Sequence, residues 1–167
     1  MTPAATSVQT TPSSPSELTT AQRLLWLGQK LAPASPLYNM AFLFTLGGEV
    51  NETYFQTAFQ AVVDRSDSLR TVIDEVDGSA IARVLSQLDY AVPVLDFREK
   101  ENAEVAVRSW AKDRTRRLFD LSSCVFDSAL LRLPTGQTIW YLNQHHLITD
   151  ISTVQLLFTT VSDFYQR

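Results

Sequence analysis

The sequence predicts an α+β fold in which helices pack on a mostly antiparallel sheet. Apolar residues recur at the helical period in some stretches, and other stretches are short runs rich in β-branched and aromatic residues. Two pairs of these runs are joined by turn-forming residues, Asp77-Gly78 and residues 134–136, which is a hairpin signal. Helices mixed with hairpins indicate helices layered on one sheet. With 167 residues, 45% of them hydrophobic, the chain can bury the core of one domain or of half a larger one.

The first 17 residues are rich in Ser, Thr, Pro and Ala and contain no Lys or Arg. Such a segment has too little apolar surface to offset the entropy lost on ordering. We therefore predict a disordered leader over residues 1–17 and a folded part over residues 18–167. The leader also lacks the charged and apolar regions of a signal peptide.

The folded part is predicted to open with a helix and a strand. Thr19 or Thr20 can cap the helix, and the prolines within residues 32–36 end it. Residues 38–46 then form a strand. Leucines at helical spacing make one apolar stripe on this helix: Leu24, Leu27 and Leu31.

Asn51 is placed to cap a second helix, and residues 69–76 and 80–85 follow as a hairpin. A short strand is expected over residues 92–95. Residues 101–117 then read as a third helix. The side chains of the second helix that should point inward recur at helical spacing: Phe55, Ala58, Phe59 and Val62.

The C-terminal part is predicted to be a second hairpin followed by a helix. The hairpin pairs residues 125–133 with 137–145, and the last helix begins near Asp150 or Ser152. The inward residues of that helix again share its period: Val154, Leu157, Phe158, Val161, Phe164 and Tyr165.

Composition excludes several classes of function. The net charge is −4, and the basic residues within 112–117 are expected to form a solvated helix face, so no nucleic-acid partner is predicted. No apolar run approaches the roughly 18 residues of a membrane span. A single cysteine, Cys124, permits no internal disulfide and fits a cytoplasmic protein. Two histidines and one thiol are too few for a zinc site, so no metal is predicted.

The only two histidines, His145 and His146, lie side by side between a predicted strand and a predicted helix, and Asp150 follows. Adjacent residues of a strand point to opposite faces. One histidine should therefore pack structurally while the other is free to hold or move a proton. Packing of both histidines remains the alternative from the residues alone. Asp150 could bond to a histidine or fix the loop through an arginine.

Three segments together resemble the condensation domains of nonribosomal peptide synthetases. His145-His146-Leu-Ile-Thr-Asp150 resembles the HHxxxD(G) signature of that family. Residues 21–26, AQRLLW, resemble its first signature segment, and residues 64–71, DRSDSLRT, resemble its second. The segments occur in the order that the family has. Condensation domains share a superfamily with chloramphenicol acetyltransferase and other acyltransferases.

The resemblance implies one lobe of a chloramphenicol-acetyltransferase-like pseudo-dimer, whose active site is a tunnel between two lobes. The chain corresponds to the N-terminal lobe and supplies one wall, with the C-terminal lobe missing, so the 167-residue fragment alone is expected to be inactive. The implied reaction is amide formation between a thioester donor and an amine acceptor. No cofactor binds directly, because the phosphopantetheine arms of carrier proteins bring both substrates. Carrier proteins and adjacent synthetase domains are the implied partners.

By position in the signature, His146 is the implied catalytic residue, which takes up a proton from the attacking amine or orients it. His145 and Asp150 are implied to be structural and to hold the loop. Arg23 and Arg70, in the other two segments, are also expected to be structural.

Several positions depart from the family pattern. Ile151 replaces the glycine after the aspartate, and a β-branched side chain there is expected to narrow the tunnel. The arginine usual in the first segment falls on Leu24, one position after Arg23. In the second segment, Ser66 and Asp67 stand where histidine and glutamate are usual.

Two further functions stay open at this stage. The chain could be a truncated, non-catalytic condensation-like module that serves a synthetase through an apolar face or a sheet edge. It could also belong to an O- or N-acyltransferase of the same superfamily that uses CoA or a carrier thioester.

Overall fold

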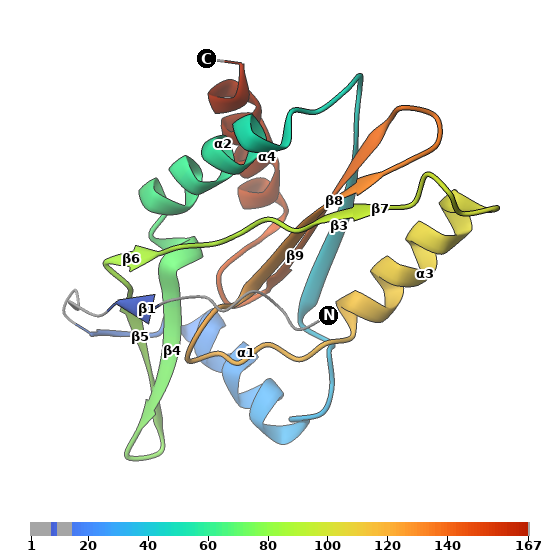
Figure 1. Cartoon of the computed structure of the whole chain (residues 1–167). Coiled ribbons are helices and arrows are strands. Elements are labelled where there is room, and N and C mark those ends of the chain that lie inside the picture. Colours follow the sequence, from blue (N-terminus) through green and yellow to red (C-terminus); the bar gives the residue numbers. More distant parts are fainter. Residues whose placement is uncertain (1–7, 10–14, 167) are drawn as a thin grey trace.

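The computed structural model describes residues 8–9 and 15–166 (Figure 1). Four helices and one 3₁₀ turn are arranged among nine strands within those residues. The helices are α1 (Thr20–Leu31), α2 (Glu52–Arg65), α3 (Ala103–Thr115) and α4 (Ile151–Tyr165), with the turn at Ser68–Arg70. The strands are β1 (Val8–Gln9), β2 (Ser16–Glu17), β3 (Asn39–Leu46), β4 (Thr71–Val76), β5 (Ser79–Val84), β6 (Gln87–Leu88), β7 (Val94–Asp96), β8 (Phe126–Arg132) and β9 (Thr138–His145).

The largest sheet has the strand order β3-β9-β8-β7. Its pairs are antiparallel except for β7 and β8, which run parallel. Helices α2 and α4 pack together over one face of this sheet, where the aromatic core gathers around Trp140 and Phe59. Helix α3 covers the opposite face through a smaller cluster that includes Val107 and Tyr141. The α+β class with helices on a mostly antiparallel sheet is therefore confirmed.

Strands β4 and β5 form the predicted hairpin, and its turn shows why. Asp77 and Gly78 have φ angles of 51° and 74°, the left-handed pair that a two-residue hairpin requires. β2 extends this hairpin into a three-stranded sheet, and β1 pairs with β6. Of the leader predicted to be disordered, residues 1–7 and 10–14 lie outside the described residues, and its remaining described residues include these two short strands.

Local capping signals set the helix starts as predicted. Thr19 caps α1 in a reciprocal capping box with Gln22, and Asn51 caps α2 by accepting from the Tyr54 N–H. Asp150 caps α4 by accepting a 2.7 Å hydrogen bond from the Thr153 N–H. The last helix therefore begins at the first of the two predicted places.

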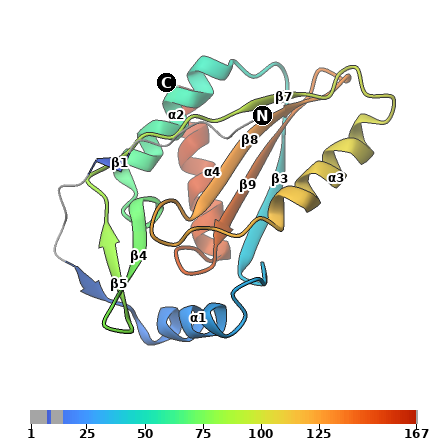
Figure 2. The same ribbon diagram turned by 60° about the horizontal axis from the view of Figure 1, so that its bottom comes forward.

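The apolar stripe of α1 faces away from the core of this chain. Leu24, Leu27 and Leu31 are 65%, 44% and 88% exposed. Trp26, on the other side of the helix, is the residue of α1 that is buried. Figure 2 shows the reason, because α1 lies beyond one end of the main sheet and meets the rest of the chain along one side only.

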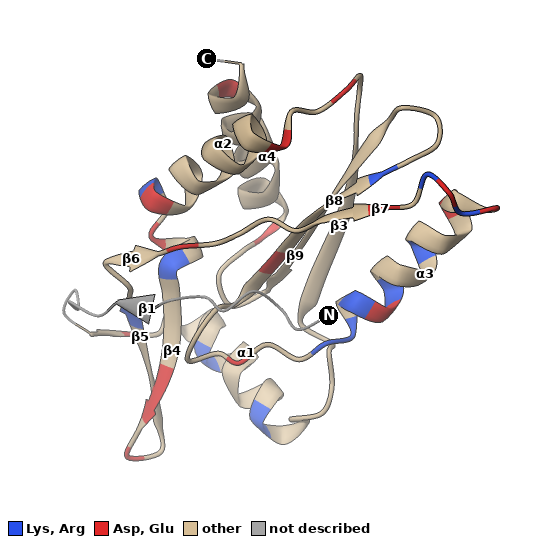
Figure 3. Ribbon diagram, in the orientation of Figure 1, with Lys and Arg blue, Asp and Glu red and all other residues tan. Residues whose placement is uncertain are grey.

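The basic cluster at the end of α3 is only partly the solvated face that was predicted (Figure 3). Lys112, Arg116 and Arg117 are exposed. Arg114 instead points inward and forms a two-bond ion pair with Asp127 of β8, with 2.8 Å between Nη2 and Oδ1.

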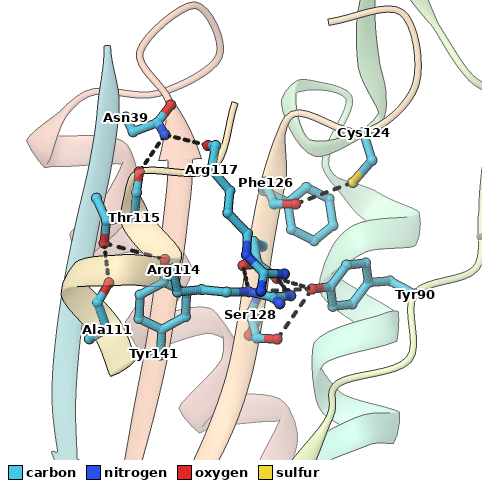
Figure 4. A network of polar contacts seen from close by, with 11 residues as sticks. Asn39, Tyr90, Ala111, Arg114, Thr115, Arg117, Cys124, Phe126, Ser128 and Tyr141 are labelled. Atoms are coloured by element: carbon cyan, nitrogen blue, oxygen red, sulfur yellow. Dashed lines mark hydrogen bonds and ion pairs between the residues drawn. The ribbon is translucent and has the colours of Figure 1, made fainter. Parts of the chain in front are cut away.

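The same carboxylate accepts a hydrogen bond from the Tyr90 hydroxyl, which in turn accepts one from the Ser128 N–H (Figure 4). Burial and the neighbouring Asp127 raise the pKa of Tyr90 well above its ordinary value. This network joins α3 and the segment before β7 to the main sheet.

No helix among the described residues is long and apolar enough to span a membrane.

Candidate active site

The two histidines lie where β9 ends, and they face opposite ways, as predicted. His145 is the last residue of β9 and is 2% exposed, whereas His146 is exposed to solvent. The His146 N–H donates to the Tyr38 carbonyl at 2.8 Å, so the chain just before β3 holds the first residue of the loop. The Ile148 N–H closes the turn by donating to the His145 carbonyl.

His145 is locked in place at both ring nitrogens. Its Nδ1 accepts from the Leu147 N–H at 3.2 Å, which leaves Nε2 to donate to Gln29 Oε1 at 3.4 Å. Its ring also packs against Tyr38 and Phe119. Burial, and to a smaller extent the charge of the next histidine, lower the pKa of His145 to about 4. His145 is therefore neutral near pH 7, with one ring nitrogen bonded to the loop and the other to α1.

His146 has one ring nitrogen engaged and one open. Its Nδ1 lies 2.7 Å from the Thr149 carbonyl oxygen. A carbonyl can only accept, so Nδ1 carries the proton and Nε2 of the neutral ring has a free lone pair. No hydrogen bond reaches Nε2 from the described part of the chain. An exposed, unprotonated imidazole nitrogen is the arrangement that a general base or a hydrogen-bond acceptor for an amine needs.

Asp150 and Ile151 begin α4 beside this ring. The bond from Thr153, together with other hydrogen bonds at the helix start, lowers the pKa of Asp150. Within the described residues, no salt bridge joins Asp150 to an arginine, and its side chain serves the helix cap. The side chain of Ile151 is 57% exposed, so it projects from the surface next to the motif.

Helix α1 holds the loop from the other side through two glutamines. Gln22 Nε2 donates to the Leu147 carbonyl at 3.0 Å, and Gln29 accepts the bond from His145. They are seven positions apart, so they lie on the same helix face. Gly28 lies so close to the Tyr38 ring that a Cβ at this position would come within 2.0 Å of the Tyr38 hydroxyl oxygen. The absence of a side chain at Gly28 lets Tyr38 fit between α1 and His145.

His146 lines two hollows. One, of about 530 Å³, is mainly apolar and is lined by Ala21, Leu24, Leu25 and Tyr38. The other, of about 230 Å³, is more polar and is lined by Ser68, Thr71 and Thr153. Four residues line both hollows and so separate them: Gln22, His146, Thr149 and Asp150. Groups bound in either hollow could therefore contact His146.

The two arginines lie outside these hollows. Arg70 is mostly buried and donates to the carbonyls of Val63 and Leu85 and to Asp67, so it joins α2 to the residue that follows β5. Arg23 is exposed and forms a 3.5 Å ion pair with Glu17. A surface pair of this kind contributes little to stability.

Several residues of the site were not predicted from the sequence. Gln22, Gln29 and Tyr38 hold the loop, and the Thr149 carbonyl sets the His146 tautomer. Only the glutamine spacing of seven carried a signal, because it indicates one polar face on α1. Within the described residues, no three His, Cys, Asp or Glu side chains are grouped as metal ligands would be.

Comparison with known proteins agrees with this geometry. A family profile described as "Condensation domain" matches residues 14–167. One component of the linear gramicidin synthase of Brevibacillus parabrevis is 31% identical over 136 residues, which are 80% of this chain and 2% of that protein. The isonitrile lipopeptide synthase of Streptomyces coeruleorubidus is 31% identical over 151 residues, 89% of this chain and 10% of that protein.

Solved structures show the same relationship. The starter condensation domain of rhizomide synthetase superposes with a TM-score of 0.85 at 28% identity, covering 92% of this chain and 39% of that one. A variant of that domain in complex with C8-CoA gives a TM-score of 0.85, also at 28% identity, and covers 90% of this chain and 35% of that one.

The chain has the α+β fold of one lobe of the chloramphenicol-acetyltransferase-like condensation-domain structures that it matches. The chain belongs to the condensation-domain family of nonribosomal peptide synthetases. It spans less than two fifths of the condensation-domain structures that it matches, and between 2% and 10% of the two synthetases. The resemblance inferred from the three sequence segments is therefore confirmed at the level of family and fold.

Proposed function

We propose that this chain is the histidine-bearing lobe of a condensation domain that forms an amide bond between a carrier-bound acyl donor and an amine acceptor. The observation that carries the proposal is the tautomer of His146. The Thr149 carbonyl holds the proton on Nδ1, Nε2 is left open, and His146 lines both hollows. In this role Nε2 accepts or orients a proton of the attacking amine, a contribution of about 10²–10⁴ in rate for acid–base catalysis.

The difference between the hollows suggests where each substrate lies. The larger hollow, with Leu24 and Leu25, suits the apolar part of an acyl group. The similar rhizomide synthetase domain that was solved in complex with C8-CoA makes an alkyl donor a reasonable occupant. The polar hollow then receives the amine. Phosphopantetheine arms bring both groups, so the reaction gains from proximity and needs no cofactor held by this chain.

We propose a second lobe as the partner of this surface. The leucines of α1 present an exposed apolar stripe, and one of them, Leu24, lines the larger hollow. Apolar area of this kind is normally covered in a complete protein. Carrier proteins and neighbouring synthetase domains are the further partners. The single cysteine is consistent with a cytoplasmic location.

The test is to identify the product of the full-length protein that contains this chain. The protein is incubated with an octanoyl or aminoacyl donor on one carrier and an aminoacyl acceptor on a second carrier. Mass spectrometry of the acceptor arm should show the donor mass joined to it as an amide. An acylated alcohol would favour the O-acyltransferase alternative, and no transfer would favour a non-catalytic interaction module.

A further inference from the structure

Gln22 of α1 connects the start of that helix to the loop after β9. Its Nε2 donates to the Leu147 carbonyl at 3.0 Å, a contact between residues 125 positions apart in the chain. Its Oε1 points the other way and accepts from the Thr19 backbone and hydroxyl at 3.0 Å each. One half-buried side chain therefore joins the start of a helix to the middle of the motif loop.

The loop needs such a connection, because the proton position on His146 depends on its shape. His146 is exposed, and one 2.7 Å bond to a carbonyl three residues later holds its ring. Leu147, whose carbonyl accepts the bond from Gln22, lies in the chain between His146 and Thr149, the two residues that this bond joins. A shift of the Leu147 peptide would move the Thr149 carbonyl relative to Nδ1. A neutral imidazole without a fixed partner exchanges between its two tautomers.

We propose that Gln22 is a positioning residue for His146: by holding the Leu147 carbonyl, it fixes the loop in the shape that keeps the proton on Nδ1 and leaves Nε2 unprotonated. The inference rests on the proposed function of His146. Gln22 also lines both hollows together with His146, so it holds the ring at the point where the hollows meet. It acts through the histidine and not on the substrate.

The two ends of the Gln22 side chain can be separated by substitution. Gln22→Glu keeps an oxygen for the capping box, which accepts glutamate as well as glutamine, and removes the donor to Leu147. Thr19→Ala removes the capping hydroxyl and retains the amide that binds Leu147. Gln22→Met removes the donor without adding a charge near His146. The three variants thus distinguish loss of the loop contact from damage to the helix start.

The chain has only two histidines, so nitrogen NMR of the ¹⁵N-labelled 167-residue protein shows only two imidazole rings. In the wild type, above the ordinary titration range of histidine, His146 should carry its proton on Nδ1 and His145 on Nε2. In Gln22→Glu and Gln22→Met, His146 should lose the fixed Nδ1–H pattern and give averaged nitrogen signals. His145 should keep its pattern, which shows that the chain is folded. Thr19→Ala should leave both rings unchanged.

An unchanged His146 tautomer in folded Gln22→Met would overturn the proposal. Averaged His146 nitrogen signals in Thr19→Ala would also overturn it, since the helix start would then be the cause. A wild-type His146 that is protonated on Nε2 would refute both this inference and the proposed role of the histidine. The readout needs no turnover. If the tautomer responds as expected while no amide forms, the proposed function fails and the positioning role stands.

Discussion

Replacing each of the two adjacent histidines by alanine should give opposite results for stability. His145 is 2% exposed and is bonded at both ring nitrogens, whereas His146 is exposed and bonded at one. Both variants replace a histidine by alanine, at adjacent positions of the chain. The structure therefore predicts a large loss for His145→Ala and a small loss for His146→Ala.

The magnitude follows from the groups that are left behind. His145→Ala leaves the N–H of buried Leu147 without its acceptor, which costs about 1–3 kcal/mol. Loss of the ring from its contacts with Tyr38 and Phe119 adds about 1 kcal/mol for the space it vacates. The total is about 2–4 kcal/mol. His146→Ala removes one hydrogen bond at the surface and should cost less than about 1 kcal/mol.

Urea unfolding near pH 7, followed by the fluorescence of the three tryptophans, measures both free energies. The unfolding slope m should be unchanged in each variant, so that the midpoints report stability. Equal losses for the two variants would refute the reasoning. So would a larger loss for His146→Ala, because the assignment of one structural and one free histidine would then be reversed.

Three more perturbations test the structure. Burial holds the pKa of His145 at about 4, against about 6.5 in the unfolded chain. Between these two pH values the unfolded chain binds more protons than the folded one. The free energy of unfolding should therefore fall by up to about 3 kcal/mol as the pH is lowered from about 6.5 to about 4. Urea midpoints across this range should show the fall, and His145→Gln should remove it. Asp127→Asn should cost about 2–4 kcal/mol in urea unfolding, since it leaves Arg114 mostly buried without its ion pair, and a loss under about 0.5 kcal/mol would contradict that. Gly28→Ala should destabilise the protein by about 1–3 kcal/mol through the clash with Tyr38. In thermal unfolding, adding Tyr38→Phe to the same chain should restore part of that loss. Independent, additive effects of the two substitutions would count against the contact.

The elements that could be predicted from the sequence are those with signals in their own residues. Thr19 and Asn51 set helix starts by capping, and Asp77-Gly78 sets a hairpin through two positive φ angles. The opposite orientation of the two histidines also followed from the two-residue period of a strand. Each of these depends on neighbours within a few positions.

Features that join distant segments could not be predicted. The parallel pairing of β7 with β8 depends on a crossover through α3, and nothing in residues 94–96 specifies it. The leucine stripe of α1 was correctly seen as apolar, but periodicity cannot tell which protein surface it meets. The contacts of Gln22 and Arg114 could not be predicted because their partners, Leu147 and Asp127, come from other elements.

The role of His146 is tested most directly by the rate of amide formation in the full-length protein with His146→Ala. We expect a rate at least about 100-fold lower than wild type, at an unfolding midpoint close to that of wild type. His145→Ala should instead lower the midpoint strongly. An unchanged rate for His146→Ala, measured with the same donor and acceptor carriers, would contradict the assignment of its free Nε2 to the reaction.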